Sequence, residues 1–278
     1  MNRRHGSPEP EKWRRLPEVW LGINLGFLGL GWAGFVLIDW LNVGELRDLV
    51  LPAVTSAPLV FLWIFSEAGP IEVAQWICLG FACLLSIRLA HRHHKQHERR
   101  WSVFFALGTG ALLLMLLEDT VNLRHILSRQ VVLPLVNGGP RSMARTLTEL
   151  SFYAFLGSMM VAFLVGTLQR FRQVPSAVRY LLAGYVFYAV AAIASASRLI
   201  GNWYEVVGAA LVNAFFPHLV DIAFSSLGAQ ALGFLLMDYL IEESLELIGA
   251  AALSTALLHL ALQMDRERAL SSPATQQD

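Results

Sequence analysis

The sequence predicts an all-α protein: a polytopic transmembrane helical bundle of about six spans, with seven possible and with both termini cytoplasmic. Of its 278 residues, 55% are hydrophobic and only 15% are charged, whereas a soluble domain carries about 25% charged residues. Several runs of roughly 20 apolar residues follow one another, each long enough to cross the ~30 Å hydrocarbon core as a helix. These runs do not alternate apolar and polar residues, which excludes the strands of a membrane barrel.

The apolar runs place the spans in order along the chain. The first run, about 19–41, follows a basic tail and ends without a small-residue cleavage site, so we expect a retained span rather than a cleaved signal peptide. The stretch at 50–65 is short and contains Pro52 and Pro58, which predicts an interfacial or re-entrant element. Further spans are expected at about 70–90, 102–122, 147–168, 180–199 and 238–262. The predicted domains are a basic cytoplasmic tail at 1–17, a transmembrane helical domain at 18–264 and a cytoplasmic tail at 265–278.

The distribution of basic residues predicts the orientation. With six spans both termini lie on one side, and fifteen of the 21 Lys and Arg residues fall on that side. Short cytoplasmic loops carry an excess of Lys and Arg, so we expect both termini in the cytoplasm. The segment 205–237 is apolar enough for a seventh span, although Pro217 and Asp221 fall in its middle. We expect an outer-face helix or a re-entrant pair there, because a seventh crossing would move the C-terminal arginines outside.

Four histidines gather in the stretch 90–100, whose sequence is AHRHHKQHERR. This run resembles one histidine box of the membrane di-iron desaturases and hydroxylases. Those enzymes need three such boxes, and the other four histidines of this chain are scattered singly. We therefore interpret the run as a short basic cytoplasmic loop that fixes the topology and meets anionic headgroups.

Acidic residues gather on the opposite, outer side of the predicted bundle. Fourteen of the 21 acids lie there or in the outer half of a span. Glu118 and Asp119 end a long uncharged stretch, and Glu149 enters the fourth span. Glu242 and Glu246, four residues apart at the start of the last span, share a helix face. A carboxylate at this depth costs about 2.5–3.5 kcal/mol, so we expect these groups to turn inward and to pair, stay protonated or bind a cation.

Three hypotheses for these acids stay open. In a structural or assembly protein, they form interhelical salt bridges with Arg124, Arg145 and Arg198, and acids that start a helix also suit its dipole. Alternatively, they form an outward-facing site for a cation, which as a divalent metal would be Mn, Fe or Zn. The candidate metal ligands are Glu118, Asp119, His125, Glu149, Glu242 and Glu246. The third hypothesis is a metal-dependent intramembrane hydrolase or lipid-modifying enzyme, whose metal activates water; the sequence leaves open whether the protein is an enzyme.

Small residues and the overall charge indicate the partners. Gly22, Gly26 and Gly29 make the first span a close-packing helix and are candidates for helix–helix oligomerisation. Membrane lipid is the expected surrounding partner. The formal net charge is zero, which gives no general attraction to nucleic acid, and no substrate is indicated.

Three acidic segments carry a resemblance to a known group. FSEAGPIEVAQWI precedes the second span, LLEDTVNLRHIL closes the third and YLIEESLELIGAA opens the last. Together, over about 65–260, they resemble a widespread group of bacterial multipass membrane proteins with no assigned activity. Ala68 stands where that group often has an acid. The resemblance implies a location in the bacterial inner membrane and supplies no reaction.

Overall fold

The computed structural model describes residues 15–54, 57–135, 141–198, 202–223 and 228–271, and these residues form helices without a strand. In this part of the chain, six helices are long and apolar enough to cross a membrane, which confirms the predicted helical bundle. The six are Leu16–Trp40, Pro70–Lys95, Arg99–Val121, Leu147–Phe171, Pro175–Ser197 and Gly228–Ala269. The last of them begins well before residue 238, where the sequence predicted its start.

Each span consists of one or more consecutive helical elements. They are α1 (Leu16–Gly34) with the π-helix η2 (Phe35–Trp40), α4 (Pro70–Lys95), α5 (Arg99–Val121), α8 (Arg141–Phe171), α9 (Pro175–Ser197), and α12 (Gly228–Leu235) with the π-helix η5 (Leu236–Glu242) and α13 (Glu243–Ser271). Pro70 and Pro175 occupy the first position of α4 and α9, where proline's missing N–H breaks no intrahelical hydrogen bond. Helix α5 ends at Asn122, whose φ of 52° is left-handed, a conformation that asparagine adopts more readily than most residues.

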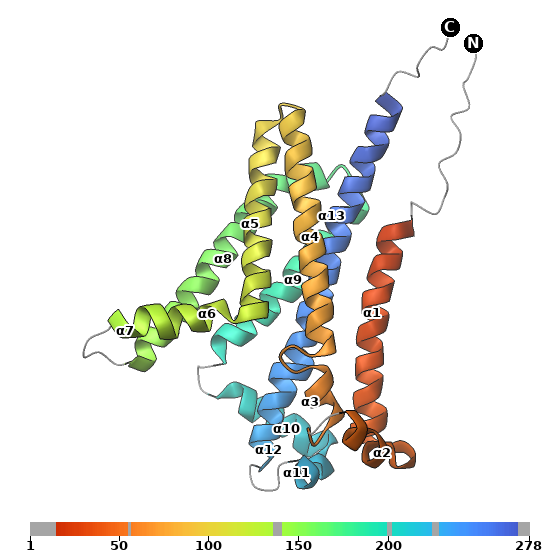
Figure 1. Ribbon diagram of the computed structural model, residues 1–278, viewed down its shortest axis with the longest axis vertical. Helices are drawn as coiled ribbons and strands as arrows, with labels where there is room; N and C mark the ends of the chain where they lie inside the picture. Colours follow the sequence, from red (N-terminus) through yellow and green to blue (C-terminus); the bar gives the residue numbers. More distant parts are fainter. Residues whose placement is uncertain (1–14, 55–56, 136–140, 199–201, 224–227, 272–278) are drawn as a thin grey trace.

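Helix α13 lies in the middle of the bundle, where α1, α4 and α9 pack against it (Figure 1). Two indole groups fasten α1 to this central helix. Trp20 Nε1 donates a hydrogen bond to Ser254 Oγ, and Trp32 Nε1 donates one to Ser244 Oγ, each at 2.9 Å. Interhelical hydrogen bonds of this kind contribute about 0.6 kcal/mol on average within a membrane.

Short helices form a layer at one end of the bundle, which we call the end layer. It comprises η3 (Val43–Glu45), α2 (Leu46–Val54), α3 (Val60–Ile64), α10 (Trp203–Phe215) and α11 (Pro217–Ala223). The end layer lies opposite the start of α1 and the end of α13, which share the other end (Figure 1). Asp39, fully buried at the end of the first span, accepts hydrogen bonds from the backbone N–H groups of Val60 and Phe61 at 2.8 and 2.7 Å. The stretch 50–65 therefore folds as two short helices anchored to the first span.

The segment 205–237 does not add a seventh span in the described part of the chain. Helix α10 has 13 residues, about 20 Å at 1.5 Å per residue, which is shorter than the hydrocarbon core. It packs against α12, and a Cβ on Gly208 would lie only 2.1 Å from the carbonyl oxygen of Gly233. The last span, at 42 residues, is about 63 Å long and extends beyond the ~30 Å core. Its first part, α12, packs against α10 and α11 of the end layer.

The histidine run departs from the predicted loop. Helix α4 continues through it to Lys95, and α5 begins at Arg99, so a tight helical hairpin replaces the loop. His93 is fully buried, its Nδ1 lies 2.5 Å from Glu98 Oε2, and its ring stacks on Phe105. At least this histidine packs inside the protein and does not meet headgroups.

Short elements also follow α5. They are α6 (Leu123–Ile126), the π-helix η4 (Leu127–Val132) and α7 (Leu133–Leu135). They carry Arg124 next to the end of α5, where it reaches the acids described next.

Candidate functional site

A cavity of about 90 Å³, here called the acidic cavity, lies where the spans meet the end layer. It is lined by Glu67, Glu72, Glu118, Asp119, Asn122, Arg124, Tyr153, Ser195, Arg198, Asp238, Tyr239, Glu242, Glu243 and Glu246. Eight of these residues carry a carboxyl group, and two carry a guanidinium group. Since roughly 10–15 Å³ is enough for one water molecule, the acidic cavity has room for a small cation and several waters.

Chain direction brings these acids to one end of the bundle. Helix α4 begins at this end with Glu72 in its first turn, and α5 returns to it with Glu118 and Asp119 in its last turn. The last span contributes its acids around the π-helix η5, which carries Asp238 and Glu242. Single π-turns inside helices are rare and are frequently found at functional sites.

Two ion pairs compensate part of the negative charge. Arg124 Nε lies 3.1 Å from Glu118 Oε1, and the backbone N–H of Arg124 donates to Glu118 Oε2 at 2.7 Å. Arg198 Nη1 donates to Asp238 Oδ1 at 2.5 Å. Burial by itself lowers the pKa of Arg198, but Asp238 and Glu242 raise it above its ordinary value, so Arg198 stays charged.

Gln75 connects two further carboxylates. Its side chain is fully buried, and Nε2 donates to Asp119 Oδ2 at 2.6 Å and to Glu246 Oε2 at 2.8 Å. These two donations fix the orientation of the amide, because a carboxylate cannot accept from Oε1. Among the described residues, Oε1 of Gln75 has no hydrogen-bond partner. A buried acceptor without a donor is costly. Gln75 does not itself line the acidic cavity, but both carboxylates that it holds do.

The other acids rely on neutral donors or on none. Glu242 Oε2 accepts from the hydroxyl of Tyr204 at 2.6 Å, and Glu72 Oε2 accepts from the backbone N–H of Ala68. Burial raises the pKa of Tyr204, and Glu242 raises it further, so the phenol remains a donor. Oε2 of Glu243 is buried and has no partner among the described residues. Within the same residues, no basic side chain lies within 4.0 Å of Glu72, Asp119, Glu242, Glu243 or Glu246.

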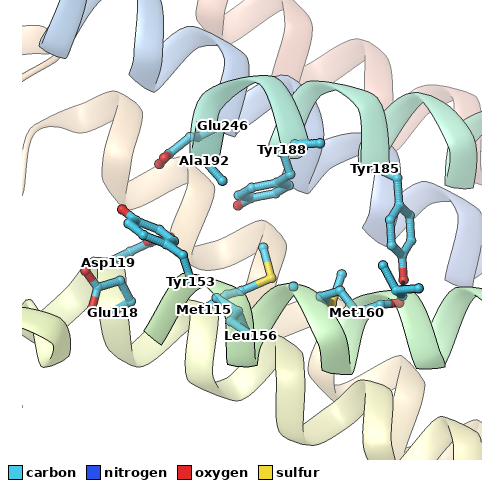
Figure 2. A pocket seen from close by; sticks show the side chains of 13 residues that line it. Met115, Glu118, Asp119, Tyr153, Leu156, Met160, Tyr185, Tyr188, Ala192 and Glu246 are labelled. Carbon is cyan, nitrogen blue, oxygen red and sulfur yellow. Dashed lines mark hydrogen bonds between the residues drawn. The ribbon is translucent and has the colours of Figure 1, made fainter. Parts of the chain in front are cut away.

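An apolar groove of about 190 Å³ adjoins the acidic cavity (Figure 2). It is lined by Met115, Glu118, Asp119, Tyr153, Leu156, Gly157, Met160, Val161, Tyr185, Tyr188, Ala189, Ala192 and Glu246, from α5, α8, α9 and α13. Four of these residues also line the acidic cavity: Glu118, Asp119, Tyr153 and Glu246. The two spaces therefore meet at a shared polar wall.

The structure brings together most of the candidate metal ligands. Glu118, Asp119, Glu242 and Glu246 all line the acidic cavity. Glu149 is buried but does not line it. The side chains of His125 and Arg145 lie outside the described residues. Among described side chains, no group of three His, Cys, Asp or Glu residues is arranged to hold a metal ion.

Several site residues were missed from the sequence. Gln75 was not singled out, although it follows Glu72 by three residues and so shares its helix face. A lone amide in an apolar span was the available signal. Tyr188 accepts a hydrogen bond from the same amide, Gln75 Nε2, at 3.5 Å.

Comparison of the chain with protein-family models, with curated proteins and with solved structures gave no match. The resemblance of the three acidic segments to a bacterial group therefore stays a prediction. What can be said of function comes from the acidic cavity and the apolar groove.

Proposed function

We propose that this multipass membrane protein binds a cation in the acidic cavity. One observation carries the proposal: eight carboxyl residues line the cavity, against two arginines that are already paired with Glu118 and Asp238. A cation placed between the remaining carboxylates would relieve their mutual repulsion. Because every carboxylate of the cavity except that of Glu67 is at least partly buried, each such interaction is stronger than at a surface.

The central pair for this role is Asp119 and Glu246. Gln75 holds both carboxylates through one nitrogen, so they face a common point without a positive charge. Glu243, with a buried and unpartnered Oε2, lines the same cavity. Ionisable groups inside a membrane domain commonly mark ion or substrate sites, which supports a binding role over a passive one.

Predictions from the sequence add an orientation, a location and candidate ligands to the proposal. The positive-inside distribution supports an outward-facing cavity, and the resemblance of the acidic segments supports the bacterial inner membrane. Manganese, iron and zinc remain the metals that suit carboxylate and imidazole ligands. His125 and Glu149 remain candidates for completing such a ligand set.

Elemental analysis of tag-free protein, paired with Mn²⁺ titration followed by electron paramagnetic resonance, tests the proposal. We expect stoichiometric cation binding by the wild type and its loss in the Asp119→Asn/Glu246→Gln double variant. Glu267→Gln is the matched control, because Glu267 is an exposed acid at the opposite end of the last helix. Equal binding by wild type and double variant would remove the cavity as the site.

The structural alternative has its own support in the two ion pairs, Arg124 with Glu118 and Arg198 with Asp238. If the acids serve only packing, added cations leave the unfolding temperature of the wild type unchanged. If they bind a cation, the wild type gains stability with cation concentration.

A further inference from the structure

We infer that the acidic cavity and the apolar groove form one site for an amphipathic amine, a protonated amino group that carries a single hydrocarbon chain and no phosphate. The inference rests on the proposed cation binding and names the class of cation. It commits to an organic ligand that reaches the site from the lipid phase.

The first support is the lining that the two spaces share. Glu118, Asp119, Tyr153 and Glu246 line both of them. A ligand in the groove would therefore have one end against these carboxylates.

The second support is the distribution of polarity along the groove. Figure 2 shows the oxygens of Asp119, Glu246 and Tyr188 gathered at one end, with Met115 and Leu156 beyond them. At the far end, the Tyr185 hydroxyl donates to the backbone carbonyl of Met160 at 2.7 Å and so offers no free donor. Such a gradient matches a ligand with a charged head and an apolar tail.

The third support is a lateral opening toward lipid. Gly157 and Val161 of α8 and Ala189 of α9 line the groove and are also exposed on the surface of the bundle. A Cβ on Gly157 would meet no atom within 4 Å, so the rim is open at this point. In a bilayer, these exposed residues of two spans face hydrocarbon chains, from which an alkyl tail can enter sideways.

The fourth support concerns the head group. Of the three carboxylates that both spaces share, Glu118 is paired with Arg124, whereas Asp119 and Glu246 are held by the neutral amide of Gln75. An ammonium group supplies three N–H donors and one positive charge, which matches the two carboxylates of Asp119 and Glu246.

The negative charge of the acidic cavity also discriminates between simple amines and aminophospholipids. A phospholipid with an amino head carries a phosphate near its ammonium group, and the uncompensated carboxylates would repel that phosphate. A simple long-chain amine carries no negative charge, and near pH 7 it is protonated, as a lysine side chain is. The occupant is therefore a long-chain amine and not an aminophospholipid.

The test measures binding of dodecylamine to the protein in phosphatidylcholine nanodiscs, by native mass spectrometry and by the shift in unfolding temperature. Dodecanol and dodecyl sulfate are the chain-matched neutral and anionic controls, and methylammonium is the head without the tail. We expect dodecylamine to bind in one copy, at least tenfold more tightly than either control and than methylammonium. Dodecanol binding as tightly as dodecylamine would overturn the inference.

Groove variants separate this inference from the proposed cation binding. Gly157→Phe fills the groove, and we expect at least a tenfold loss of dodecylamine affinity with methylammonium and Mn²⁺ binding unchanged. Ala189→Phe, a second rim variant, is expected to do the same if Gly157→Phe folds poorly. The matched control is Gly80→Phe on α4, where a Cβ also meets nothing within 4 Å, and it should leave every affinity unchanged.

The outcomes are distinct. If dodecylamine binding survives both groove variants while Glu246→Gln abolishes binding of Mn²⁺ or methylammonium, the inference fails and the proposed function stands. If no cation binds to the wild type, both fail. Loss of dodecylamine binding in the groove variants, with small cations still bound, supports both.

Discussion

Tyr204 donates its phenolic hydrogen to Oε2 of Glu242 over 2.6 Å, which joins the end layer to the last membrane span. Tyr204 is almost fully buried, at 1% exposure, so no water replaces this donor. The contact also anchors the π-helix η5, whose last residue is Glu242. It ties the position of α10 to the shape of the acidic cavity.

Removing that hydroxyl tests the coupling. Tyr204→Phe leaves the Glu242 carboxyl buried without its donor, and we expect a loss of about 1–3 kcal/mol of stability. Chemical denaturation in detergent micelles measures it. Tyr239→Phe is the matched control, because Tyr239 lines the same cavity and, among the described residues, its hydroxyl donates no hydrogen bond to these acids. A loss in Tyr239→Phe as large as that in Tyr204→Phe would contradict the assignment.

Replacing Gln75 tests whether a bound cation compensates the charges of Asp119 and Glu246. Gln75→Leu removes the donor that Asp119 and Glu246 share, so the cation-free protein should unfold at a lower temperature. A bound cation would then compensate both carboxylates. We therefore expect a larger cation-induced rise in unfolding temperature than in the wild type, measured by tryptophan fluorescence. An equal rise in both proteins would argue against a cation at this pair.

Breaking the Arg198–Asp238 pair should be costly. Both side chains are mostly buried, at 19% and 17% exposure, and removing one partner of a buried pair costs about 3–5 kcal/mol. We expect that loss for Arg198→Gln and a partial recovery in the Arg198→Gln/Asp238→Asn double variant. A double-mutant cycle of unfolding free energies gives the coupling.

The exposed pair at the other end provides the contrast for this cycle. Arg88 and Asp265 lie 2.7 Å apart at 58% and 39% exposure, and exposed pairs contribute about 0–1 kcal/mol. We expect Arg88→Gln to change stability by no more than that. A comparable loss in Arg88→Gln and Arg198→Gln would show that burial does not set the cost.

Gly249 should tolerate no side chain. A Cβ there would lie 2.6 Å from Cδ2 of Tyr188, and overpacking of this kind costs about 1–3 kcal/mol. We expect Gly249→Ala to lower the unfolding temperature and to displace Tyr188 at the wall of the apolar groove. Gly80→Ala, with open space around its Cβ, should change neither stability nor ligand binding.

The glycines of α1 carry a prediction about association. Gly22, Gly26 and Gly29 each have open space where a Cβ would lie, so no helix in the described part of the chain fills that face. If the face associates, Gly26→Leu should reduce the dimer fraction measured by single-molecule photobleaching in nanodiscs, without lowering the stability of the monomer. An unchanged dimer fraction, or a monomeric wild type, would reject association through this face.

The sequence was sufficient for the bundle because each span is an apolar segment long enough to cross the bilayer. It also drew attention to the acids at the ends of the spans, since charge in an apolar run is conspicuous. Interior contacts were harder to predict. Gln75 became a site residue only because α4, α5 and α13 bring Asp119 and Glu246 to the same amide, which no local pattern encodes.

The remaining discrepancies also have physical causes. The last span begins at Gly228 because α12 continues through a π-helix into α13, whereas the acids from Asp238 onward suggested a helix start. The histidine run was assigned to a loop on polarity alone, but His93 finds a partner in Glu98 and a stacking surface in Phe105. Tertiary contacts outweighed polarity in both places.

The indole hydrogen bonds of α1 have a consequence for biosynthesis. Trp20 and Ser254 are separated by 234 positions, and Trp32 and Ser244 by 212. At 5–20 residues per second, the ribosome needs roughly 10–50 s to supply these acceptors after α1 has been made. During that interval the first span is in the membrane and neither indole has its serine acceptor. The docking of α1 on α13 can therefore be completed only at the end of translation. A truncation before Ser244 should leave α1 inserted yet undocked, and accessible to crosslinkers that the complete chain excludes.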